Sequence, residues 1–147
     1  VIFDVFYRNN PLDSGYAISA GLKQVIDYIK NLHFSKQDID YLSSLGIFDS
    51  DFLDYLDTFQ FTGDIYAIPE GTVIFPREPL IKVIAPIMEA QLVETAILTI
   101  LNHQCLIATK ASRVCSAAKG DGIMEFGLRR AQGPDAGIYG AAGLVLR

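Results

Sequence analysis

The sequence has few residues of the kinds that hold metals or build disulfide frameworks. Its 147 residues include two cysteines, two histidines and no tryptophan. Cys105 and Cys115 lack the clustered Cys/His spacing of a zinc site, so we expect no metal centre. Both lie in an apolar, helix-like context, which predicts reduced thiols in the core. On one helix they would be about 15 Å apart, which is beyond the reach of a disulfide.

Positive charge and long apolar runs are also scarce. The chain has 12 Lys and Arg against 17 Asp and Glu, a net charge of −5. It shows no basic patch or stripe of the kind that binds nucleic acid. It also has no uninterrupted run of about 18 apolar residues and no basic segment of a secretion signal. We therefore expect a cytoplasmic protein with no nucleic-acid partner and no membrane association.

The sequence does contain enough apolar material for a core. Half of it is hydrophobic, with 9 Phe and 7 Tyr, which argues against a disordered chain. Its length fits one domain and the beginning of a second. It opens inside a strand-like run at Val1 and stops in an apolar run at Leu144–Arg147. We interpret it as a fragment of a longer protein.

Strand and helix patterns divide the first 60 residues. Val1–Tyr7 alternates in the manner of a strand. A helix is expected from about Tyr16 to Leu32, because apolar residues recur on one face. Two short helices should follow, each behind a capping residue: Ser35 to Gly46, where Asp38 completes a capping box, and Asp49 or Ser50 to Phe59. The acidic residues of this stretch indicate solvated helix faces.

The period changes after Phe61. Residues 61–85 predict short strands broken by Gly and Pro, in the manner of a small β sandwich. Ile87–Gln104 and Leu106–Ala118 predict two apolar helices, the first begun by Pro86 at its first position. One polar stripe crosses the first helix, at Gln91, Thr95, Thr99 and Asn102. The stripe makes ordinary polar contacts between helices, or it borders a cavity or a partner chain.

The stretch Gly122–Asp135 carries the most chemistry. It begins as an apolar run with the composition of a buried strand, delivers Arg129 and Arg130, and breaks at Gly133-Pro134. Two arginines at the exit of a buried strand are costly unless an anion or carboxylate meets them. In α/β folds, ligands bind outside the carboxyl ends of strands. The pair therefore binds a phosphate or carboxylate ligand, or it is satisfied by the protein's own carboxylates or by water.

Four stretches, in order along the chain, resemble nicotinate phosphoribosyltransferases. The most specific is Phe126–Asp135, "FGLRRAQGPD". The others are "FDVFYRNNPLDSGYAISAGL" (residues 3–22), "YAIPEGTVIFPREPLIKVIAP" (66–86) and "EAQLVETAILTILNHQCLIATKASRV" (89–114). After Asp135 the chain departs from the family pattern, which suggests a truncation, a frameshift or a cloning boundary. The related quinolinate enzymes have an arginine where this chain has Thr95, and this departure favours nicotinate, which has a single carboxylate.

The resemblance implies an α+β fold. Residues 1–118 would be the N-terminal domain, with helices, a barrel-sandwich-like β unit at 61–85 and helices at 86–118. Residues 119–147 would begin a truncated α/β barrel, of which this chain contains the first strand.

The resemblance also implies an activity. The family joins nicotinate to phosphoribosyl pyrophosphate, forming nicotinate mononucleotide in NAD salvage, and hydrolyses ATP with Mg²⁺. No bound prosthetic group is expected. The substrate-binding residues would be Phe126, Gly127, Leu128, Arg129 and Arg130, with Phe126 stacked on the pyridine ring and the arginines on the carboxylate or a phosphate. Arg8 and Tyr16 border the site, or they are a surface charge and a core residue.

Parts of the family's machinery are absent from this sequence. The histidine that the family phosphorylates belongs to a later barrel segment, and His33 and His103 are in the wrong contexts to replace it. We therefore expect no catalytic residue in this chain. The family resemblance also implies a homodimer in the full-length protein. The alternative is a non-catalytic interaction or structural fragment with a biotinyl-like β sandwich. A carrier function is disfavoured because Lys82 lies in the middle of an expected strand rather than at a hairpin tip.

Overall fold

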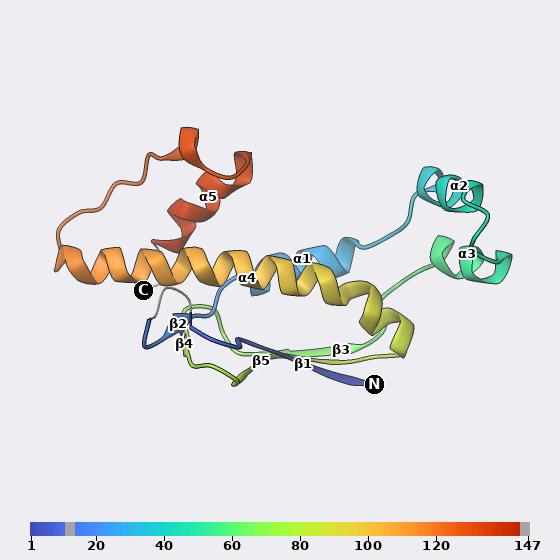
Figure 1. Ribbon diagram of the computed structural model, residues 1–147, viewed down its shortest axis with the longest axis horizontal. Helices are drawn as coiled ribbons and strands as arrows, with labels where there is room; N and C mark the ends of the chain where they lie inside the picture. Colours follow the sequence, from blue (N-terminus) through green and yellow to red (C-terminus); the bar gives the residue numbers. More distant parts are fainter. Residues whose placement is uncertain (11–13, 145–147) are drawn as a thin grey trace.

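The computed structural model describes residues 1–10 and 14–144. The molecule is elongated around one long helix, α4 (Ile87–Ala118). Small sheets lie along one side of this helix, and helix α5 (Pro134–Gly143) packs against its C-terminal half (Figure 1). A pair of short helices, α2 (Lys36–Ser44) and α3 (Ser50–Asp57), projects at the opposite end. The expected mixed α+β fold is confirmed.

The strands form two small open sheets. Strands β1 (Ile2–Phe6), β5 (Pro79–Ile84) and β3 (Asp64–Ala67) are antiparallel in the order β1-β5-β3. Strands β2 (Ala17–Ile18) and β4 (Val73–Ile74) pair separately. The expected strands at 1–7 and within 61–85 are confirmed, and the strands of the described residues do not close into a barrel. Lys82 pairs with Asp4 and Tyr66 in the middle of β5, so it does not occupy a hairpin tip.

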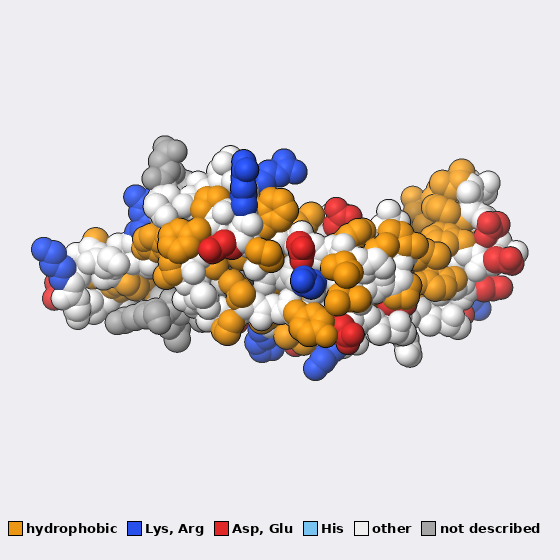
Figure 2. Space-filling view, turned by 90° about the horizontal axis from the view of Figure 1, so that it is seen from below, with side chains coloured by type: hydrophobic (Ala, Val, Ile, Leu, Met, Phe, Trp, Pro, Cys, Tyr) orange, Lys and Arg blue, Asp and Glu red, His pale blue; other side chains and the backbone are white. Residues whose placement is uncertain are grey.

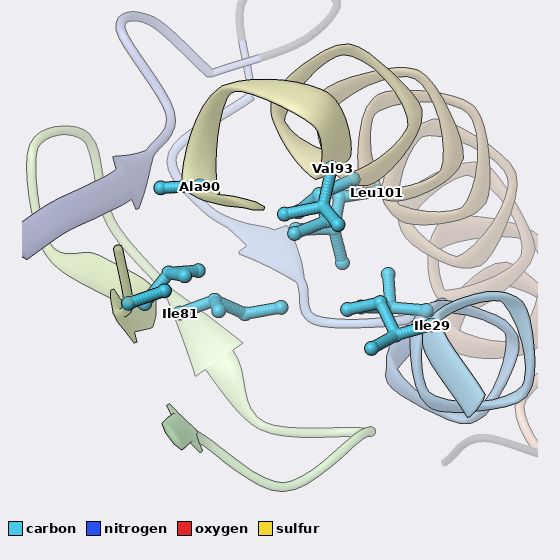
Figure 3. Close-up of a cluster of buried hydrophobic side chains, with 9 residues drawn as sticks. Ile29, Ile81, Ala90, Val93 and Leu101 are labelled. Carbon is cyan, nitrogen blue, oxygen red and sulfur yellow. The ribbon is translucent and has the colours of Figure 1, made fainter. Parts of the chain in front are cut away.

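The core lies between this sheet, α4 and helix α1 (Leu22–Asn31). The alternate residues Ile81 and Val83 of β5 point into it, which is the period-2 pattern of a half-buried strand. On α4 the residues Val93, Ile97 and Leu101 follow helical spacing and meet Ile29 of α1 (Figure 3). The two helices expected at 87–104 and 106–118 are one continuous helix, because no Gly or Pro interrupts them.

Helix α4 is long and apolar enough to cross a membrane when judged by length and composition alone. Its most apolar window has a mean hydropathy of 1.3, and 39% of that window is buried inside the fold. Polar residues such as Gln91 and Asn102 interrupt the run, which is why the sequence shows no continuous apolar stretch. A core helix of this kind passes the same test.

The helix expected from Tyr16 begins six residues later, and this expectation is wrong for residues 16–21. Gly21 has a φ of 100°, which a helix cannot continue. Its N–H donates to Glu70 Oε1 at 2.6 Å, so a carboxylate from the β3–β4 turn holds the start of α1. The apolar residues Ala17 and Ile18 are buried and form strand β2.

The projecting helical hairpin agrees closely with the sequence. Ser35 caps α2 and forms the predicted capping box with Asp38, and Asp49 caps α3. Most of its residues are exposed, including Tyr41 and Ile47. Acidic side chains gather at this end of the molecule (Figure 2), as expected for solvated helix faces.

Candidate functional site

The segment Phe126–Arg130 follows α4 after a left-handed residue, Lys119, with a φ of 51°. Residues 121–127 have no regular structure, and Leu128–Arg130 form a single turn of 3₁₀ helix. The expected buried strand is therefore wrong for this structure: Phe126 is 80% exposed and Met124 81%. A strand needs a neighbour to receive its backbone hydrogen bonds, and neither sheet of the described residues extends to this segment.

Both arginines of the predicted site are exposed on the 3₁₀ turn. Within residues 1–10 and 14–144, neither forms an ion pair, so no carboxylate of that part of the chain satisfies them. The premise that the pair is costly does not apply here, because an exposed guanidinium keeps its hydration. The turn presents two exposed cations, unpaired among the described residues, and the exposed Phe126 precedes it by two positions, so these groups can meet an anionic aromatic ligand.

Local contacts fix this turn. The Arg130 N–H donates to Gly127 O at 2.8 Å and the Ala131 N–H donates to Leu128 O at 3.1 Å. The Glu125 carboxylate accepts from the Gly127 N–H, and a Cβ at 127 would lie only 2.7 Å from Glu125 Oε1. Gly127 has an ordinary φ of −82°, and Glu125 Oε1 is the end of an exposed side chain, so a substitution at 127 would displace this contact rather than prevent the turn.

A cavity of about 340 Å³ lies on one side of the turn. Its wall includes Arg130, Glu125 and Gln132 from the turn region and His103 from α4. The ring of His103 also meets the edge of Tyr139, with centroids 6.0 Å apart. The structure thus brings Arg130 beside polar groups of the long helix, while Phe126 and Leu128 lie outside this cavity.

A larger cleft of about 500 Å³ separates the end of β1 from α4. Thr99 and Asn102 of the polar stripe line it, together with Arg8 and Tyr7. The C-terminal half of the stripe thus borders a cavity, which is one of the two alternatives that the sequence offers. The other half of the stripe, Gln91 and Thr95, is exposed to solvent.

Sequence reasoning missed a line of polar contacts on α4 that holds Tyr7, Tyr16, Ile18 and Ala20. The Tyr7 hydroxyl donates to Asn102 O at 3.2 Å, the Ala20 N–H donates to Cys105 Sγ at 3.3 Å, and the Ile18 N–H donates to Thr109 Oγ1 at 2.9 Å. The hydroxyls of Tyr16 and Ser112 are 2.9 Å apart, so Tyr16 has a structural contact. The helical spacing of 102, 105, 109 and 112 was the available signal.

Two titratable groups belong to this line, the half-buried Tyr7 and the buried Cys105. Burial raises the pKa of the Tyr7 hydroxyl, and the neighbouring Cys105 raises it further. Burial also raises the pKa of the Cys105 thiol, although hydrogen bonds from Ala20 and Tyr7 act in the opposite direction. Cys105 is buried, Cys115 is half-buried, and both are free, so the prediction that they do not pair is confirmed.

Across residues 1–10 and 14–144, no group of three or more His, Cys, Asp or Glu side chains is placed to hold a metal ion. His33 hydrogen-bonds through Nδ1 to Asn31 O at 2.7 Å, at the end of α1. His103 contacts the ring of Tyr139, and among the described residues neither histidine forms an ion pair with a carboxylate.

The fold is that of an α+β domain built on one long helix, with an exposed cationic turn at its C-terminal side. Residues 1–102 match the model of the nicotinate phosphoribosyltransferase (NAPRTase) N-terminal domain. The chain belongs to this family, and the resemblance seen in the four segments is confirmed.

Individual relatives agree. The chain is 47% identical over 135 residues to nicotinate phosphoribosyltransferase pncB2 of Mycobacterium tuberculosis, covering 92% of the chain and 29% of that protein. It is 43% identical over 145 residues to nicotinate phosphoribosyltransferase of Bacillus subtilis, covering 99% of the chain and 30% of that protein. This second alignment extends into the segment after Asp135, where we had expected a departure from the family.

A solved structure agrees with the fold. The crystal structure of human nicotinic acid phosphoribosyltransferase superposes with a TM-score of 0.86 at 32% identity, covering 97% of the chain and 30% of that protein. The chain thus spans about 30% of the length of each of these three proteins.

Proposed function

We propose that the complete gene product joins nicotinate to phosphoribosyl pyrophosphate and forms nicotinate mononucleotide in NAD salvage. One observation supports the assignment of particular residues to the substrate site. Arg129 and Arg130 stand exposed and without an ion pair in the described residues, in the same short segment as exposed Phe126, within a chain of this family. A pyridine carboxylate needs a cation for its charge and a flat apolar surface for its ring.

The chemistry of this transfer explains why these residue types are required. The bond from ribose C1 to pyrophosphate breaks as the nicotinate nitrogen approaches, through an oxocarbenium-like transition state. A protein accelerates such a step by positioning the reactants and by holding their anionic groups. We assign Arg129 and Arg130 to the carboxylate or to a phosphate, and Phe126 to the ring. Gly127 leaves the ligand side of the turn without a side chain.

ATP hydrolysis with Mg²⁺ belongs to the proposal as an expectation from the family. The described residues do not fit a metal, because no three or more of their His, Cys, Asp or Glu side chains are placed to hold one. We therefore assign no residue of this chain to Mg²⁺, and no residue to the histidine that would be phosphorylated. Those groups would come from other parts of the gene product.

The same proposal assigns a place to the exposed segment after α4. We infer that residues 119–147 begin the α/β barrel domain, and that strands from elsewhere in the gene product pair with residues 121–127. Pairing would bury apolar side chains such as Met124, which is 81% exposed in this chain. The domain at residues 1–118 would be the N-terminal domain of a cytoplasmic homodimer, with a barrel-sandwich-like unit at 61–85.

The test is a transferase assay. The complete gene product, incubated with nicotinate, phosphoribosyl pyrophosphate and MgATP, should form nicotinate mononucleotide, measured by liquid chromatography. The 147-residue chain alone should form none, since it lacks the histidine segment of the family. A complete gene product that is folded yet makes no nicotinate mononucleotide would overturn the proposal.

A further inference from the structure

The turn that carries the arginines is seated on helix α5 through one side chain. Leu128 lies directly against Gly137: a Cβ at residue 137 would overlap Leu128 Cδ1 and lie 3.3 Å from Leu128 Cβ and Cγ. No residue with a side chain fits there unless Leu128 moves. The missing side chain of Gly137 therefore leaves a slot on α5 for one side of Leu128, while the residue as a whole is 61% exposed.

Helix α5 is in turn fixed on the long helix. A Cβ at Gly143 would be 3.2 Å from Ile107 Cγ2 and 3.5 Å from Ala111 Cβ, so the two helices are close at this point. Four residues earlier in α5, the ring of Tyr139 contacts the ring of His103 in a T-shaped arrangement. Because α4 runs through the core, these contacts give α5 a defined position relative to the rest of the domain.

The position of Leu128 determines where both arginines stand. Leu128 and Arg130 belong to one 3₁₀ turn, which is closed by the bond from the Arg130 N–H to Gly127 O. Leu128 Cδ1 can rotate away from a Cβ added at residue 137, but Leu128 Cβ cannot, so the backbone of the turn has to shift by a few tenths of an ångström. A displacement of about 1 Å at a binding group is enough to cost on the order of 100-fold in rate.

We propose that Gly137 is a positioning residue for the arginine pair, acting through Leu128. This inference rests on the proposed function, in which the pair holds the nicotinate carboxylate or a phosphate. It also gives Leu128 a role as the anchor of the turn, beside the substrate contact that the family resemblance implies.

Two glycine substitutions on the same helix provide a matched test. Gly137→Ala and Gly140→Ala raise the helix propensity of α5 equally. A Cβ at Gly140 would lie 3.8 Å from Glu125 Cγ, an ordinary contact. In the complete gene product we expect Gly137→Ala to lower kcat/KM per folded molecule by at least about tenfold. Gly140→Ala should stay within about twofold of the unsubstituted enzyme.

A second pair of variants separates positioning from folding. Leu128→Ala empties the slot, so Gly137→Ala should have almost no further effect in that background, within about twofold. A purely structural glycine would instead give a lower Tm and near-normal kcat/KM per folded molecule. Active unsubstituted enzyme with an unaffected Gly137→Ala variant overturns this inference alone. Inactive unsubstituted enzyme overturns the proposed function, and this inference falls with it.

Discussion

The carboxylate of Glu89 accepts two hydrogen bonds from Thr62, one from its backbone N–H at 2.7 Å and one from its hydroxyl at 2.9 Å. Glu89 lies in the first turn of α4 and is 6% exposed. Thr62 lies between α3 and β3, so the pair joins the base of the projecting hairpin to the long helix. A buried carboxylate is tolerated because both of its oxygens have donors.

We expect loss of the Thr62 hydroxyl to destabilise the protein. Thr62→Val keeps the shape of the side chain and leaves one carboxylate oxygen without its donor. Hydrogen bonds to charged groups contribute about 1.5–3 kcal/mol, so the free energy of unfolding should fall by about that amount in urea denaturation. Thr62→Ser retains the hydroxyl and is the control. Equal losses in both variants would show that the methyl group, not the hydrogen bond, matters at this position.

We expect any substitution of Gly63 to destabilise the protein. A Cβ there would lie 2.5 Å from both Ala85 Cβ and Ile84 O, and neither atom belongs to a flexible side chain. Over-packing of this kind costs about 1–3 kcal/mol, so Gly63→Ala should lower the Tm clearly. Gly122→Ala is the control, since nothing lies within 4 Å of its Cβ position. Similar Tm values for the two variants would contradict the close approach of β3 and β5 at this point.

Stability should decline in alkaline solution. Burial raises the pKa values of Cys105 and Tyr7 above their ordinary values of 9.0 and 10.0. The folded state therefore keeps protons that the unfolded state releases above about pH 9, and the free energy of unfolding falls as pH rises. Below that pH both states are protonated and the contribution is constant. The doubly substituted Cys105→Ala, Tyr7→Phe protein should show a flatter profile between pH 8.5 and about 11. An equally steep profile would assign the loss to other groups.

The parts of the fold that the sequence predicted are those decided by local chemistry. Ser35 and Asp38 need only each other to cap α2, so their spacing was sufficient. Residues 16–21 were different, because their apolar spacing is compatible with a helix. Hydrogen bonds from Ile18 to Thr109, 91 residues away, and the positive φ of Gly21 select a strand and a turn instead.

The candidate site shows the same division. The residue types and order of Phe126–Arg130 could be read from the sequence, but their surroundings could not. An apolar run such as residues 122–126 is compatible with a buried strand only if other strands cover it. In the described structure none does, and Phe126 and Leu128 are exposed. The slot at Gly137 was also invisible, because it depends on how α5 crosses the turn.

Arg129 provides the sharpest test of the proposed site. Its side chain is exposed and forms no ion pair among the described residues, so Arg129→Ala removes no contact that supports the fold. We expect a Tm within about 2 °C of the unsubstituted protein, since surface substitutions rarely change stability by more than about 0.5 kcal/mol. In the complete gene product the guanidinium would instead hold an anion in the transition state. Loss of such a contact costs roughly 2–4 kcal/mol, or about 30- to 1000-fold in kcat/KM.

Arg129→Lys keeps the charge but not the bidentate geometry, and should recover only part of the activity. Arg113→Ala, an exposed arginine of α4 outside the turn, is the matched control. A large fall in Tm with normal kcat/KM per folded molecule would make Arg129 a structural residue and remove it from the site.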